Sequence, residues 1–132
     1  MKKISQEELN EILESHVLWL RGEGGLQADL TNVDLSNADL KYAVLKHAEL
    51  IHVNLRGANL SNADLRFTDL RCADLSNADL KFADLRHADL RHANLINTNL
   101  KYTNLTYADL SDADLNNANL EYTKTNNYTV GL

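Results

Sequence analysis

Acidic side chains recur in this sequence at intervals of twenty residues, and two histidines and the single cysteine form a second set with the same spacing. A row of carboxylates could present negative charge to a partner, and imidazole and thiolate groups are good zinc ligands. The members of either set can form one surface or site only if the fold brings positions twenty apart close together. The acids with this spacing are Asp29, Glu49, Asp69, Asp89 and Asp109, and the histidines and cysteine are His52, Cys72 and His92.

Leucine occupies every fifth position from Leu30 to Leu120 without a gap. A small residue stands two positions before each leucine, and Asp or Asn stands between them except at Val44 and Glu49. On an α-helix five residues advance by about 500°, so no face would stay apolar. In an extended segment residues two apart share a face, so the small residue and the leucine point inward together. The two remaining residues must then turn the chain.

Repetition of this unit winds the chain into a coil with leucine always inside. Sorting the second residue after each leucine at intervals of twenty separates aromatic from asparagine-rich sets, whereas intervals of fifteen mix them. We therefore predict four sides per coil, with positions twenty apart stacked on one another. One predicted stack of core residues is Leu30, Leu50, Leu70, Leu90 and Leu110. The predicted aromatic column contains Tyr42, Phe82, Tyr102 and Tyr122, and a further corner reads His47, Phe67, His87 and Tyr107.

The first 25 residues follow a different pattern. Ser5 and Glu8 have the spacing of a helix capping box, and apolar residues then recur at steps of three and four. Glycines stop this pattern after Leu20, so we predict a helix from about Gln6 to Leu20 that covers the first coil. The expected organisation is residues 1–25 as an amphipathic capping helix with a glycine-rich turn, 26–123 as the repeat β-helix and 124–132 as a degenerate tail.

Composition limits the classes of protein. The chain has 132 residues, no proline, a net charge of −6 and one cysteine, Cys72, which suits a reducing cytosol. No signal sequence is visible, and no apolar run approaches the roughly 20 residues of a membrane span. The acidic balance argues against direct nucleic-acid binding. We therefore expect a cytoplasmic protein that binds neither membranes nor nucleic acids.

The run ANLSNADLRFTDLRCADLSNADLKFADLRHADL, which begins at Ala58, resembles the pentapeptide-repeat family, whose unit is A-(D/N)-L-x-x. The resemblance covers residues 28–122. It implies an all-β solenoid, a right-handed quadrilateral parallel β-helix, here with the N-terminal capping helix. Some members of this family resemble double-stranded DNA in shape and charge, bind DNA gyrase and protect it from quinolones or other poisons.

Two interpretations of the acidic row remain open. The row could mimic a nucleic-acid backbone, or each Asp or Asn could hydrogen-bond the neighbouring backbone in its turn. Lys or Arg often follows the leucine, and residues 26–123 contain fourteen acids and nine bases. We expect Arg71 and Arg91 to pair with the acidic row. The aromatic column likewise has two interpretations, as a partner contact or as stacking that stabilises adjacent coils.

We predict no catalytic, cofactor or metal site. Stacked residues such as His52, Cys72 and His92 cannot converge easily on one tetrahedral ion, and a filled coil offers no concave pocket. The predicted function is a non-enzymatic bacterial protein-interaction or scaffold module with an unknown partner. The alternative is a DNA mimic that binds gyrase or another topoisomerase. At the C-terminal end the apolar residues Tyr122, Tyr128, Val130 and Leu132, the valine in the leucine phase, predict a homodimer through the last coil.

Overall fold

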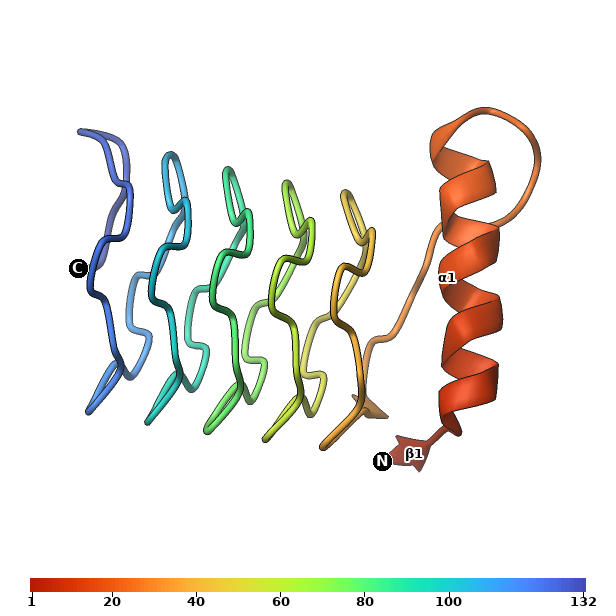
Figure 1. Ribbon diagram of the computed structural model, residues 1–132, viewed down its shortest axis with the longest axis horizontal. Helices are drawn as coiled ribbons and strands as arrows, with labels where there is room; N and C mark the ends of the chain where they lie inside the picture. The colour runs from red at the N-terminus through yellow and green to blue at the C-terminus, as the bar shows by residue number, and fades with distance from the viewer.

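The computed structural model describes residues 1–132 and shows a rod of stacked coils with one helix across its N-terminal end (Figure 1). Residues twenty apart lie opposite each other in parallel bridges, beginning with Asp29 and Glu49 and continuing to Asn104 and Lys124. Since twenty residues are four units of five, each coil has four sides. The predicted right-handed quadrilateral β-helix is confirmed.

Leucine and alanine fill the inside of the rod. The predicted stack of Leu30, Leu50, Leu70, Leu90 and Leu110 is at most 1% exposed. Each buried leucine stabilises the fold by about 1.5–3 kcal/mol relative to an exposed one. Threonines that replace alanine bond to leucine carbonyls, as Thr68 does to Leu65 at 2.7 Å. No buried side-chain nitrogen or oxygen lacks a hydrogen-bond partner.

The corners depend on one residue with positive φ in every unit. The second residue after each leucine has φ between 56° and 69° at all nineteen positions from Asn32 to Tyr122. The amide of the next residue then donates back to the leucine carbonyl, as Ala63 does to Leu60 at 3.0 Å. Asparagine and glycine adopt this left-handed conformation most easily, but here aromatic residues and histidines adopt it too.

Helix α1 (Gln6–Leu20) covers the first coil. Its capping residue Ser5 accepts a hydrogen bond from the amide of Glu8 at 3.1 Å, as the capping-box spacing predicts. Leu9 is 1% exposed, and the two-residue strand β1 (Lys2–Lys3) pairs in parallel with β2 (Val33–Asp34). The helix and β1 thus occupy the N-terminal edge of the coils. Helix α1 is neither long enough nor apolar enough to cross a membrane.

One extra residue changes the register of the last coil. Asp109 lies opposite Val130, at a separation of 21 residues instead of 20. Val130 has the leucine phase in the sequence, but this shift places it at the outward middle position, where it is 43% exposed. The inward position before it holds Thr129, whose hydroxyl donates to the Leu105 carbonyl at 2.8 Å. Val130 therefore lies outside the core, although it has the leucine phase in the sequence.

His16 joins α1 to the first two coils. Its Nδ1 accepts a hydrogen bond from the amide of Ala28 at 2.9 Å, and its Nε2 lies 2.8 Å from the carbonyl oxygen of Lys46. Because one ring nitrogen accepts and the other donates, the imidazole is neutral with its proton on Nε2. The side chain is fully buried, and this burial lowers the pKa of His16 below its usual value.

We predict that His16 makes stability depend on pH. The unfolded chain binds a proton near pH 6.5 and the folded chain resists it, so the free energy of unfolding should decrease as pH falls below 6.5. His16→Gln should flatten this decrease, measured by thermal unfolding followed by circular dichroism between about pH 7.5 and 5. His92→Gln, at an exposed corner, is the control and should keep the wild-type slope. Equal slopes in all three proteins would contradict the prediction.

Candidate functional site

The acidic row forms as the sequence predicts. Parallel bridges join each member to the next, in the order Asp29, Glu49, Asp69, Asp89 and Asp109. Two of the five carboxylates are held by arginines two residues further along the chain. Arg71 donates from Nε and Nη2 to the two oxygens of Asp69, at 2.8 and 2.7 Å, and Arg91 does the same to Asp89, at 2.9 and 2.6 Å.

Arginine therefore neutralises the middle of the acidic row. The hydrogen bonds from Arg91 hold the pKa of the Asp89 carboxyl below its usual value. Nε of Arg91 also lies 3.8 Å from an oxygen of Asp109, in the next coil. A carboxylate that accepts two hydrogen bonds from one guanidinium presents little free negative charge to a partner. The row is thus a mixed strip rather than a continuous negative one.

The Asp and Asn side chains also hold the turns. In seventeen of the nineteen units their Oδ1 accepts a hydrogen bond from the amide two residues later, as Asp79 does from Lys81 at 2.9 Å. The two units without this bond are those with Val44 and Glu49. These are the two positions where the sequence departs from Asp or Asn. The Asp and Asn residues, including four of the five members of the acidic row, are therefore turn-forming residues.

The predicted aromatic column, which we name the first column, is only partly stacked. The Phe82 and Tyr102 rings lie 4.8 Å apart and the Tyr102 and Tyr122 rings 5.0 Å apart. Tyr42 lies one coil further, beyond Asn62, and is 67% exposed. The second column is continuous over five rings, with centroids 4.5–5.2 Å apart. Its members are His47, Phe67, His87, Tyr107 and Tyr128.

The sequence pattern missed the last ring of the second column. Four of its members recur at intervals of twenty, but Tyr128 follows Tyr107 by 21 residues and stacks on it at 5.2 Å. The same extra residue that displaces Val130 thus continues the column. In this coil the side chain of Asn126 replaces a backbone carbonyl as the partner of a corner amide. Its Oδ1 accepts a hydrogen bond from the Tyr107 amide at 3.2 Å.

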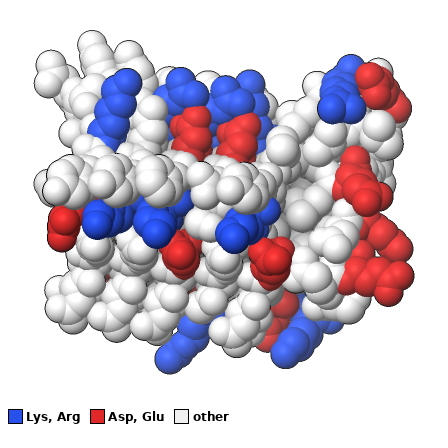
Figure 2. All heavy atoms as spheres, in the orientation of Figure 1, with Lys and Arg blue, Asp and Glu red and all other residues white.

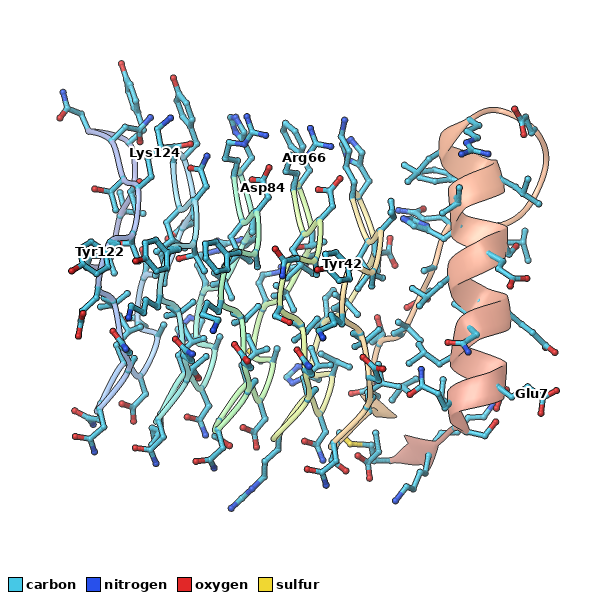
Figure 3. All side chains as sticks on the ribbon, in the orientation of Figure 1. Glu7, Tyr42, Arg66, Asp84, Tyr122 and Lys124 are labelled. Carbon is cyan, nitrogen blue, oxygen red and sulfur yellow. The ribbon has the colours of Figure 1, made fainter.

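One side of the rod lies between the two columns, and we name it the aromatic-flanked side. Figure 2 shows Lys and Arg above and below a band of uncharged side chains along the rod, and Figure 3 places Tyr42 and Tyr122 on that band with Arg66 and Lys124 above it. A shallow hollow of about 280 Å³ lies on this side. The outward residues of the side are Val44, Lys46, Asp64, Arg66, Asp84, Arg86, Asn104, Thr106 and Lys124.

The column of ligand-type residues does not assemble a metal site. His52, Cys72 and His92 occupy the same corner in three successive coils, all with positive φ. His92 lies 3.9 Å from Asp112 in the next coil, but no three His, Cys, Asp or Glu side chains come close enough to hold one ion. Cys72 is an exposed free thiol.

These features define a solenoid repeat protein with a packed interior of leucine and alanine. The family model described as pentapeptide repeats matches residues 28–66, 58–95 and 93–124, with eight copies. The chain belongs to the pentapeptide-repeat family.

Several solved structures are similar. A pentapeptide repeat protein from the Arabidopsis thaliana thylakoid lumen is 31% identical, with a TM-score of 0.58 over 80% of this chain and 68% of that chain. One from Nostoc Pcc 7120 is 33% identical, with a TM-score of 0.36 over 88% and 80%. QnrB1, a plasmid-mediated fluoroquinolone resistance protein, is 20% identical, with a TM-score of 0.37 over 76% and 61%. A search of curated proteins found no significant match.

We predict that Asp109 contributes to stability as a hydrogen-bond acceptor rather than as a charge. Its Oδ1 accepts from the Ser111 amide at 3.0 Å and from the Ser111 hydroxyl at 2.6 Å. Asp109→Ala should lower the free energy of unfolding by about 0.5–1.5 kcal/mol per lost bond, whereas Asp109→Asn, which keeps the acceptor, should change it by less than about 0.5 kcal/mol. Urea unfolding measures both, with Asp112→Asn as a control for charge loss alone. If Asp109→Asn lowers the free energy of unfolding as much as Asp109→Ala does, the negative charge of Asp109 is what stabilises the fold.

Proposed function

We propose that this protein is a non-enzymatic protein-interaction module. Leucine and alanine fill the space inside the coils, and the sides carry only shallow hollows, so the outward side chains are the groups available for function. Enzymes bind substrates in concave pockets that bury most of the ligand. Flat, rigid surfaces with aromatic and arginine side chains are typical of protein–protein contacts.

The observation that carries this proposal is the exposure of the aromatic columns. Stacking covers the ring faces but leaves Phe82 51% exposed and Phe67 44% exposed. Tyr122 and Tyr128 are each 68% exposed at the C-terminal end of their columns. Aromatic side chains and arginine supply most of the hot spots in protein interfaces. The two columns and the arginines between them therefore have the composition of a binding surface.

The alternative function is DNA mimicry directed at DNA gyrase or another topoisomerase, with an effect on quinolone or toxin sensitivity. Mimicry needs a continuous row of free negative charge along the rod. The pairs Asp69–Arg71 and Asp89–Arg91 interrupt such a row, and nine bases are distributed among the repeats. The aromatic columns are the better-supported contact surface for this reason.

We predict that the first column is required for partner capture. Asparagine suits the left-handed corner, so Phe82→Asn with Tyr102→Asn should remove the rings and keep the fold. Affinity capture from native host extract, quantified by mass spectrometry, should lose a specific partner with this variant. The matched control, His52→Asn with His92→Asn, changes corners on another side and should retain it.

The same experiment separates the two functions. Equal capture by wild type, variant and control would contradict a role for the column. Capture of gyrase that survives loss of the rings but disappears with Asp69→Asn and Asp89→Asn would establish the alternative instead.

We also propose a homodimer through the last coil. Leu115 and Leu120 are only half-buried, whereas the leucines of the preceding coils are fully buried. The backbone amides of Leu115 and Leu120 donate to no backbone carbonyl. Unpaired strand edges of this kind pair readily with another chain. The exposed apolar residues Tyr128 and Val130 lie in the same coil.

We predict a dimer mass by light scattering coupled to gel filtration, rising with protein concentration. Val130→Lys should return the mass to that of a monomer, because a buried charge at the interface would be unpaired. Leu18→Lys, on exposed helix α1, is the control and should leave the dimer intact. A monomer mass for wild type at high concentration would contradict the dimer.

A further inference from the structure

The aromatic-flanked side differs from the rest of the rod in its charge. It carries four cations, Lys46, Arg66, Arg86 and Lys124, against two carboxylates, on a protein whose net charge is −6. None of the other three sides has more bases than acids. A positive side on an acidic protein favours an acidic partner and sets the orientation in which that partner approaches.

The two carboxylates on this side hold the arginines in place. Arg66 donates from Nε and Nη2 to the two oxygens of Asp64, at 2.8 and 2.7 Å. Arg86 makes the same pair of bonds to Asp84, with shortest distances of 2.9 and 2.6 Å. A guanidinium has five N–H donors, so each arginine keeps three that these bonds do not use. Both side chains remain partly exposed, at 33% and 43%.

Fixed arginines favour binding, because less side-chain freedom is lost when a ligand arrives. They line the hollow of about 280 Å³ together with Thr106, Lys124 and three rings of the second column, Phe67, His87 and Tyr107. These rings stack face to face, and the edges of stacked rings point outward. Aromatic edges carry partial positive charge and attract carboxylate oxygens. Cations and ring edges thus surround one hollow, and Figure 3 places two of its lining residues, Arg66 and Lys124, along the same edge of the rod.

We propose that the aromatic-flanked side binds an acidic, extended segment of a partner protein, whose carboxylates meet Lys46 and Lys124 and accept hydrogen bonds from the unused N–H groups of Arg66 and Arg86. This inference rests on the proposed function and adds the chemistry of the partner. A nucleic acid fits less well, because its charged backbone would also meet the neighbouring side that carries the acidic row. A short peptide with a few carboxylates occupies one side alone.

The test uses a fluorescein-labelled deca-glutamate peptide and the full chain. Fluorescence anisotropy at about 50 mM NaCl should show saturable binding, since surface attraction is weakly screened at low salt. In ¹H–¹⁵N NMR spectra, shifts should concentrate on the aromatic-flanked side. Lys46→Glu with Lys124→Glu, which leaves the Asp–Arg pairs intact, should weaken binding by at least about tenfold. The matched control, Arg21→Glu with Arg56→Glu, makes the same charge change elsewhere and should stay within about twofold.

Several outcomes would overturn the inference. Absence of binding, or equal weakening by both double variants, would leave no site on this side. Tighter binding of a single-stranded oligothymidylate with the same NMR shifts would make it a nucleic-acid site. The inference and the proposed function can fail independently. If capture from host extract requires Phe82 and Tyr102 but tolerates Lys46→Glu with Lys124→Glu, the protein is an interaction module without a site for acidic segments on this side.

Discussion

Every coil of this protein depends on a corner residue held at positive φ once in five positions. For residues other than glycine this conformation costs of order 1–3 kcal/mol unless surrounding bonds enforce it. Here two kinds of hydrogen bond hold the corners. The amide of the corner residue donates to a carbonyl of the next coil, as Tyr42 does to Ser61 at 3.0 Å, and the amide of the following residue donates to the leucine carbonyl of the same turn. With this corner in place, positions twenty apart must stack. Every column on the surface follows from that geometry.

The same geometry explains why acidic residues are poor evidence for a charge-based function here. The turn needs an Oδ1 acceptor, and the Asp and Asn side chains both supply one, as Asp74 and Asn94 do on one side. The choice between them therefore changes the charge of a side without changing its backbone. One side combines acids at all five stacked positions with two arginines, whereas the aromatic-flanked side has only Asp64 and Asp84. Charge per side is thus set independently of the fold.

Strict periodicity made the fold predictable from sequence, and departures from it were the features that sequence missed. The leucine spacing predicted which residues are buried inside the coils, and the spacing of Ser5 and Glu8 predicted where α1 begins. The single residue inserted before Val130 was invisible, because nothing local distinguishes a shifted register from a degenerate tail. The role of His16 cannot be predicted from the sequence, because its partners Ala28 and Lys46 meet it only in the folded cap. The sequence does carry one signal for positive φ, because six of the nineteen corner residues are asparagine.

A corner residue can therefore be exchanged for partner recognition at little cost to the fold. Its backbone is fixed by the coil, its side chain points to solvent, and neighbours one coil away offer stacking when both are aromatic, as with Phe67 and His87 at 4.5 Å. Stacking offsets the lower tolerance of a ring for the left-handed conformation and leaves the ring edges free. The two columns are thus stable without a partner and still suited to one. Rigid rings beside arginines held by their own carboxylates lose little freedom on binding, which supports the proposal that this side of the rod selects a partner by charge and edge contacts.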